Sequence, residues 1–151
     1  MIHRLATAMA AAIFCYGIAS AATPAAELTI TLENLRSDQG QVMICVFSAE
    51  SSAIDAFPDC VKGRPVRKGN AAIRGGKAVV SYSGLKDGVY AVAAIHDENG
   101  NGELDTNFLG IPTEGVGVSN NPRLFGKPHF PDARFEIKGK TAIAVSVKYI
   151  L

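Results

Sequence analysis

The stretch Val89-Tyr90-Ala91-Val92-Ala93-Ala94-Ile95-His96 decides the fold class of this 151-residue chain. Successive side chains of a β-strand point to opposite faces, and here both faces are apolar up to His96. A short strand that is apolar on both faces is typical of the centre of a covered sheet. The stretch therefore predicts the innermost strand of a β-structure, and the turn residues Gly84–Gly88 lead into it.

Six further short stretches show strand periodicity between turn residues. Val42–Phe47 is continuously apolar and predicts a second central strand, whereas Gly75-Gly76 indicates a tight hairpin between two others. Residues 48–70 are rich in Ser, Pro, Gly and charge, and we expect a loop there with one helical turn near residues 53–57. The seven strands are expected at residues 27–33, 42–47, 71–73, 77–82, 89–96, 134–138 and 141–149.

No stretch has the pattern of a convincing amphipathic helix. We therefore predict an all-β chain, a single antiparallel β-sandwich of immunoglobulin-like or prealbumin-like type with one long Gly/Asn-rich loop. The formal charge of +1 disfavours a nucleic-acid partner, because binding through phosphates requires a strongly basic surface. Trp is absent, which also disfavours carbohydrate clefts built on stacked Trp rings.

The amino-terminal residues have the pattern of a secretory signal peptide. A cationic start, Met1–Arg4, is followed by the apolar stretch Leu5–Ala19 and the small-residue site Ala19-Ser20-Ala21. The apolar stretch is shorter than the ~20 residues that span a bilayer, and no later segment is apolar for long enough, so the chain is not expected to span a membrane. We predict a signal peptide at 1–21, which removes Cys15, and a periplasmic or secreted β-sandwich domain at 22–151.

Cys45 and Cys60 remain in the predicted mature chain. An even number of cysteines in an exported domain indicates a disulfide. A bridge that closes a loop of about 15 residues contributes roughly 3 kcal/mol in the chain-entropy model. Two buried free thiols are the alternative, and a catalytic thiol is disfavoured because neither cysteine has a CxxC partner or a neighbouring His.

The segment from Asp97 to Phe130 shows no helix or strand periodicity, and such long connections are usually functional or disordered. Six glycines indicate a specific path with several positive φ angles. We expect this segment to be ordered, because it contains apolar residues that can pack onto the sandwich: Phe108, Leu109, Ile111, Val116, Val118, Leu124 and Phe125.

The segment opens with the pattern D-x-N-x-N-G-x-x-D, which is the oxygen-donor spacing of the first nine positions of an EF-hand calcium loop. Ca²⁺ takes six to eight oxygens, and alternate residues of a curled chain present them when a Gly at the sixth position allows the turn. The predicted ligands are the side chains of Asp97, Asn99 and Asn101, the carbonyl of Glu103, and the carboxylate of Asp105.

The twelfth position departs from the pattern, because Phe108 stands where a bidentate Glu is expected. Glu114 is the first choice to complete the shell, and Asn120 or Asn121 is the second. So few carboxylates would suit affinities of about 10⁻⁴–10⁻³ M, those of extracellular calcium modules. The alternative is an Asx-turn and glycine-rich hairpin without metal.

A family resemblance rests on Gly88-Val89-Tyr90, the run His96 to Gly102, Leu104 to Asn107, Gly110-Ile111-Pro112, Glu114-Gly115 and Ser119-Asn120-Asn121. These residues resemble the bacterial family called domain of unknown function 2141, over nearly all of the mature chain. The resemblance implies an exported β-sandwich with no assigned reaction. More distantly, Leu85 with Gly88-Val89-Tyr90 and Val92 is similar to a strand of prealbumin-like and adhesin-repeat domains, an analogy of fold alone.

Three function classes stay open. The first is a non-catalytic module that binds an unknown cell-envelope ligand or protein through a calcium-ordered loop, 97–121, whose surface includes His96, Asn107, Asn120 and Asn121. The second is an envelope structural or assembly protein without a ligand. The third is a hydrolase-type enzyme with His96, Asp97 and Glu114 as acid/base groups, although no nucleophile motif accompanies them. A basic cluster also indicates either an acidic envelope partner or a solvated strand edge: Lys62, Arg64, Arg67 and Lys68.

Overall fold

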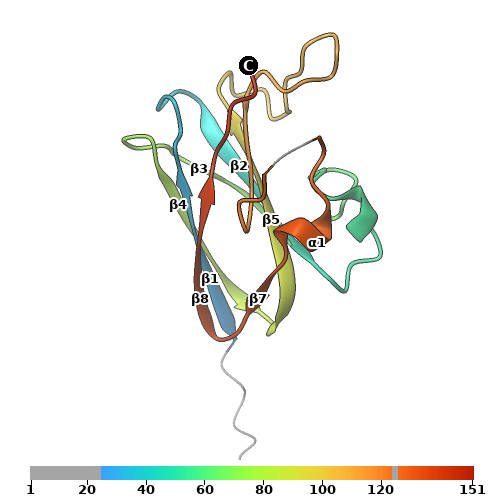
Figure 1. Ribbon diagram of the computed structural model, residues 1–151. Helices are drawn as coiled ribbons and strands as arrows, with labels where there is room; N and C mark the ends of the chain where they lie inside the picture. The colour runs from blue at the N-terminus through green and yellow to red at the C-terminus, as the bar shows by residue number, and fades with distance from the viewer. Residues whose placement is uncertain (1–24, 124–125) are drawn as a thin grey trace, which may run out of the picture.

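Two β-sheets packed face to face form the computed structural model, which describes residues 25–123 and 126–151 (Figure 1). The smaller sheet has the strand order β4 (Ala78–Leu85), β1 (Ala26–Glu33), β8 (Lys140–Ser146). The larger sheet has the order β3 (Arg67–Ala71), β2 (Gln41–Ser48), β5 (Gly88–Asp97), β6 (Gly115–Val118), and β7 (Phe135–Ile137) also pairs with β5. The described residues contain two short helical turns, a 3₁₀ helix at Ile54–Ala56 and α1 (Phe130–Ala133). The prediction of an all-β sandwich is confirmed.

The main core lies between the two sheets. β5 occupies the centre of the larger sheet, as its sequence predicts, and turns Tyr90 and Val92 toward the smaller sheet. β1 supplies Leu28, Ile30 and Leu32, which alternate with polar residues and are fully buried. Full burial of an aliphatic side chain is worth about 1.5–3 kcal/mol, so each of these three residues stabilises the packing of the two sheets by about that amount.

The outer face of the larger sheet is also apolar. Cys45 and Phe47 of β2 are fully buried there, and Phe57 and Phe130 pack edge-to-face beside them. The predicted disulfide is present, and it joins Cys45 to Cys60 with the Cα atoms 5.9 Å apart. The disulfide-linked segment and α1 thus cover one part of this face (Figure 1).

The strand pairing differs from the sequence prediction at three places. Arg67–Ala71 was expected to be loop up to residue 70, but it forms the edge strand β3, where Arg67 and Lys68 match the solvated-edge alternative. Gly75 and Gly76 do make a tight turn with φ of +59° and +70°, but β3 before it and β4 after it join different sheets. In addition, β1 and β8 are parallel, whereas all other strand pairs are antiparallel.

The long segment after β5 contains a strand, β6, which the sequence did not predict. A Cβ atom on Gly115 would lie 2.5 Å from Cε1 of Tyr149, and one on Gly117 would lie 2.9 Å from Cγ1 of Val145. The glycines therefore allow β6 to approach the carboxyl-terminal segment closely. The same glycines explain why the strand was not predicted, because a sequence that alternates Gly with Val is more typical of a turn than of a strand.

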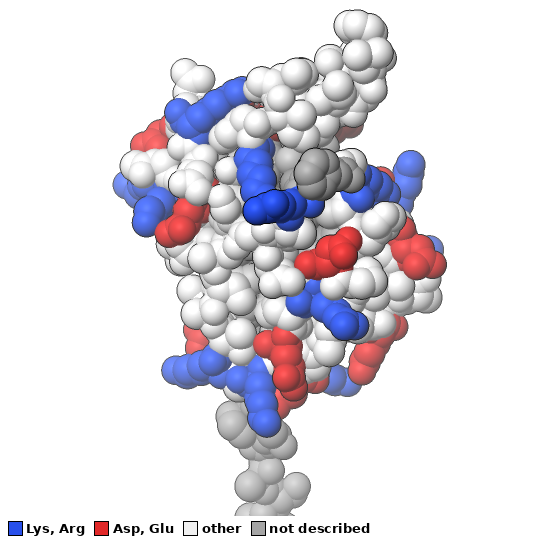
Figure 2. Space-filling model, viewed as in Figure 1, with Lys and Arg blue, Asp and Glu red and all other residues white. Residues whose placement is uncertain are grey.

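The expectation that Phe108 and Leu109 pack onto the sandwich is wrong. They are 94% and 68% exposed. The Oδ1 atom of Asn107 accepts hydrogen bonds from the backbone N–H groups of Leu109 and Ile111, at 2.9 and 3.0 Å, and so holds the tip in a tight turn away from the sheets. The resulting hairpin projects at the top of Figure 1, and its tip carries no charge in Figure 2.

Several predictions concern residues outside the described ranges. These are the signal peptide at 1–21, Cys15, and the apolar residues Leu124 and Phe125. Within the described ranges, no helix has the length and hydropathy needed to cross a membrane.

Candidate functional site

Asp97 ends β5 and anchors the loop that follows it. Its carboxylate is fully buried and accepts hydrogen bonds from Nε2 of Gln41 at 3.1 Å and from the N–H groups of Asn101 and Gly102, both at 3.0 Å. Burial raises the pKa of Asp97, but these bonds and one from the N–H of Gly100 outweigh it and hold the pKa below its usual value. The loop therefore curls around an ionised carboxylate.

Three further side chains meet beside this turn. The amide nitrogen atoms of Asn99 and Asn101 both donate to the Asp105 carboxylate. The amide oxygen atoms of Asn99 and Asn101 accept the N–H groups of Asn101 and Glu103, at 3.0 and 2.9 Å. The side chains of Asp97, Asn99, Asn101 and Asp105 are thus gathered by one curled segment, whereas the Glu103 side chain is exposed.

Glu114 ties the two ends of the loop together. It is 5% exposed, and its two oxygen atoms accept the N–H groups of Glu98 at 2.8 Å and Asp105 at 3.1 Å. Among the described residues, no group of three or more His, Cys, Asp or Glu side chains is placed to hold a metal ion. Any cation in this loop would therefore depend on the amide oxygen atoms of Asn99 and Asn101 and on backbone carbonyls.

The polar groups of the hydrolase alternative are all engaged within the fold. His96 is fully buried, with Nδ1 2.7 Å from the Tyr149 hydroxyl and Nε2 2.8 Å from the Gln39 carbonyl oxygen. Asp97 and Glu114 accept the backbone hydrogen bonds described above. None of the three side chains lines the pocket that lies over β2, β5 and β6. Through these hydrogen bonds, the three side chains connect β5 to the loop and to the carboxyl-terminal segment.

The other three asparagines of the predicted loop surface also form hydrogen bonds to backbone groups. Asn107 shapes the tip of the hairpin, whereas Asn120 and Asn121 lie after β6 and have φ of +64° and +46°. Asn120 donates to the Asp132 carbonyl, and Asn121 accepts the N–H of Ser146 at 2.7 Å. Asn120 and Asn121 therefore connect β6 to α1 and β8, apart from the cluster around Asp97.

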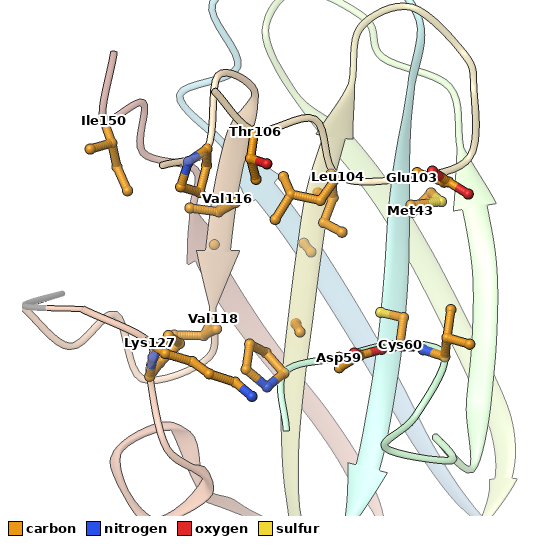
Figure 3. A pocket seen from close by; sticks show the side chains of 18 of the residues that line it. Met43, Asp59, Cys60, Glu103, Leu104, Thr106, Val116, Val118, Lys127 and Ile150 are labelled. Carbon is orange, nitrogen blue, oxygen red and sulfur yellow. Dashed lines mark hydrogen bonds between the residues drawn. The ribbon is translucent and has the colours of Figure 1, made fainter. Parts of the chain in front are cut away.

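A pocket of about 800 Å³ lies on the part of the larger sheet that the disulfide-linked segment leaves open (Figure 3). Its floor consists of side chains on β2, β5 and β6, which form two cross-strand rows: Met43, Ile95 and Val116 in one, and Ala93 with Val118 in the other. The walls are residues 58–61, 102–112 and 126–128. The floor is apolar, while polar and charged groups stand at the two ends.

Sequence reasoning missed this pocket, although a signal for it is present. Val42–Phe47 and Val89–His96 are apolar on both faces, so the chain needs a cover for each face. The three-stranded sheet covers one face. Among the described residues, the disulfide-linked segment and α1 cover only part of the other face. The small side chain of Ala93 also leaves space over the middle of the floor.

A family model described as uncharacterized protein conserved in bacteria (DUF2141) matches residues 30–144. The chain belongs to this family. The match runs from β1 into β8 and includes the Asp97 loop and every strand of the pocket floor. Neither a curated protein nor a solved structure is significantly similar to the chain, so the distant prealbumin-like similarity is not confirmed. Membership in DUF2141 brings no assigned reaction, and the geometry of the site carries the functional argument.

Proposed function

We propose that the protein is an exported, non-catalytic binding module that holds a small apolar ligand in the pocket above β2, β5 and β6. The pocket is the observation that carries this proposal. Its volume of about 800 Å³ lies within the range of roughly 300–1,000 Å³ that is usual for small-molecule sites, and such sites are mostly apolar. The Cys45–Cys60 disulfide supports an oxidising, periplasmic or extracellular location.

The proposal gives the Asp97 loop a mechanical role. Residues 102–112 form one wall of the pocket, and their position depends on the bonds that Asp97 and Glu114 make to the loop backbone. We propose that Ca²⁺ bound by Asp97, Asn99, Asn101, Asp105 and nearby carbonyls stiffens this wall. The support is the oxygen-donor spacing and the gathering of these side chains by one curled segment. Calcium binding requires Asn99 and Asn101, whose amide nitrogen atoms donate to Asp105 in this structure, to present their amide oxygen atoms instead.

A fluorescence titration with the uncharged apolar probe N-phenyl-1-naphthylamine tests the pocket. Val116 points into the pocket, so Val116→Phe should occupy part of the space above the floor and weaken probe binding at least tenfold (Figure 3). The matched control is Val79→Phe, at a 60% exposed position on β4 in the other sheet, which should bind like wild type. Circular dichroism checks that both variants fold. Absence of probe binding to wild type, or equal binding by both variants, would refute the proposal.

A thermal unfolding series with CaCl₂ or EGTA tests the metal. At 10 mM Ca²⁺ and a dissociation constant of about 10⁻³ M, binding to the folded state adds about 1.4 kcal/mol of stability. Asp105→Asn should abolish this gain, whereas Asp55→Asn in the 3₁₀ helix should retain it. A calcium-independent melting temperature in wild type would remove calcium and leave the apolar pocket in place.

An assembly role is the second candidate function, and the exposed hairpin tip favours it. Phe108 and Leu109 are two large apolar side chains held in solvent, which is typical of contact surfaces when such residues cluster. Sedimentation at high protein concentration should show self-association that Phe108→Ser reduces. A monomer at every concentration would contradict self-assembly.

A further inference from the structure

We infer that the ligand of this pocket is an amphipathic molecule with an apolar chain and an anionic end group, and that the anionic end lies beside Lys127 and Lys68. The inference rests on the proposed binding function and adds the chemical class and the orientation of the ligand. It follows from the distribution of charge around an otherwise apolar pocket.

The two ends of the pocket differ in charge. Figure 3 shows Asp59, Cys60 and Lys127 at one end and Glu103, Leu104 and Thr106 at the other. The apolar rows of the floor separate these ends. A ligand with a single charged group therefore has one orientation that brings opposite charges together and one that brings like charges together.

Lys68 belongs to the same end as Lys127. It pairs with Cys45 across β3 and β2, Cys45 pairs with Ala93, and Ala93 pairs with Val118, so the four residues form one row across the sheet. Cys60, which is bonded to Cys45, lies above this row. Its place in this row puts Lys68 at this end on the β3 side. Lys127 lies at the same end near Val118 of β6 (Figure 3).

Positive charge dominates this end. Among the described residues, the ion pairs within 4.0 Å involve the cations Arg36, Lys77 and Lys140, so neither Lys68 nor Lys127 is in such a pair. One carboxylate, that of Asp59, is nearby, and its Oδ1 atom accepts the N–H groups of Val61 at 2.8 Å and Lys62 at 2.9 Å. The two lysines that line this end therefore outnumber its one carboxylate, which is already bound to backbone and lies close enough to Lys127 to feel its charge.

The opposite end of the pocket disfavours an anionic group and suits the apolar end of the ligand chain. Glu103 is exposed and carries negative charge at that rim, while Leu104, Ile111 and Pro112 present apolar surface beside it. A carboxylate, sulfonate or phosphate end group gains free energy beside the lysines and loses it beside Glu103, because opposite charges attract and like charges repel.

Competition against bound N-phenyl-1-naphthylamine tests the inference with three probes of equal chain length: dodecanoate, dodecan-1-ol and dodecyltrimethylammonium. Dodecanoate should displace the dye from wild type at a concentration at least tenfold lower than the alcohol, and the ammonium compound should be the weakest. The double variant Lys68→Gln/Lys127→Gln should bind dodecanoate no better than dodecan-1-ol, with the affinity for the alcohol unchanged. Lys86→Gln/Lys138→Gln removes the same charge outside the pocket and should leave all three affinities unchanged.

The outcomes separate this inference from the proposed function. Equal affinities for dodecanoate and dodecan-1-ol, or the same loss in both double variants, would overturn the anionic ligand and leave an apolar pocket. Tightest binding of the ammonium compound would overturn the orientation as well. Failure of the dye and all three chains to bind wild type would instead refute the binding function itself.

Discussion

Glu114 offers the sharpest test of how the loop is held. Glu114→Ala removes the acceptors of two backbone N–H groups, those of Glu98 and Asp105. Hydrogen bonds to charged groups contribute about 1.5–3 kcal/mol each, but the Asp105 N–H becomes partly hydrated once the side chain is lost, because Asp105 is half-buried. We expect the free energy of unfolding to fall by about 2–4 kcal/mol. Glu114→Gln keeps one acceptor oxygen and should lose about half as much.

Urea unfolding followed by circular dichroism measures these changes. The control is Glu103→Ala in the same loop, whose exposed side chain should change the free energy of unfolding by less than about 0.5 kcal/mol. Because the loop also forms a wall of the pocket, Glu114→Ala should also weaken binding of N-phenyl-1-naphthylamine. Equal stabilities of the two alanine variants would show that the Glu114 carboxylate does not hold the loop.

Three further predictions concern stability. The pKa values of Asp97 and of Glu98, which the Arg36 guanidinium binds, lie below their ordinary values. The two ionised carboxylates therefore stabilise the fold fully above their unfolded-state pKa values, and this stabilisation is lost as the pH falls. The urea concentration at the unfolding midpoint should decrease once the pH is below about 5, and a midpoint that does not change between pH 7 and pH 3 would contradict this. Cys60→Ser should cost roughly 3 kcal/mol in urea unfolding, and wild type in reductant should match it, whereas an unchanged midpoint would show that the disulfide adds nothing. Phe108→Ala should change the unfolding free energy by less than about 0.5 kcal/mol, because that side chain is 94% exposed; a larger loss would mean that the tip packs in solution.

The two central strands could be recognised because they are continuous apolar runs. β2 pairs along its whole length with residues 90–97 of β5, and most side chains on both faces of the two strands are buried, as the pattern requires. The disulfide was predicted from the number of cysteines and from the expected export of the chain. By contrast, β3 was not recognised because an edge strand such as Arg67–Ala71 needs little apolar surface. β6 was not recognised because Gly115 and Gly117, which pack under Tyr149 and Val145, interrupt its apolar pattern.

The candidate site could be predicted only in part. The D-x-N-x-N-G pattern correctly marked a tightly curled segment, because Asp and Asn side chains accept backbone N–H groups two to five residues ahead. The role of Glu114 as a clamp needed the structure, since its partners at Glu98 and Asp105 are 16 and 9 residues away. The pocket lay beyond prediction for the same reason, because its walls come from three separate segments.

The sequence by itself determined the β-sandwich class, the two innermost strands, the disulfide pair and the curled start of the loop, because each depends on periodicity or on interactions between near neighbours. The tertiary structure alone decided which sheet each edge strand joins, the parallel pairing of β1 with β8, the outward position of Phe108, and the opening of a charged-ended pocket over Ala93 and Val116. Apart from the turn at Phe108, which local bonds to Asn107 hold, these features arise from contacts between segments far apart in the chain. Such contacts depend on the area of each apolar face that neighbouring segments leave uncovered, and this area is set only when the layers pack together.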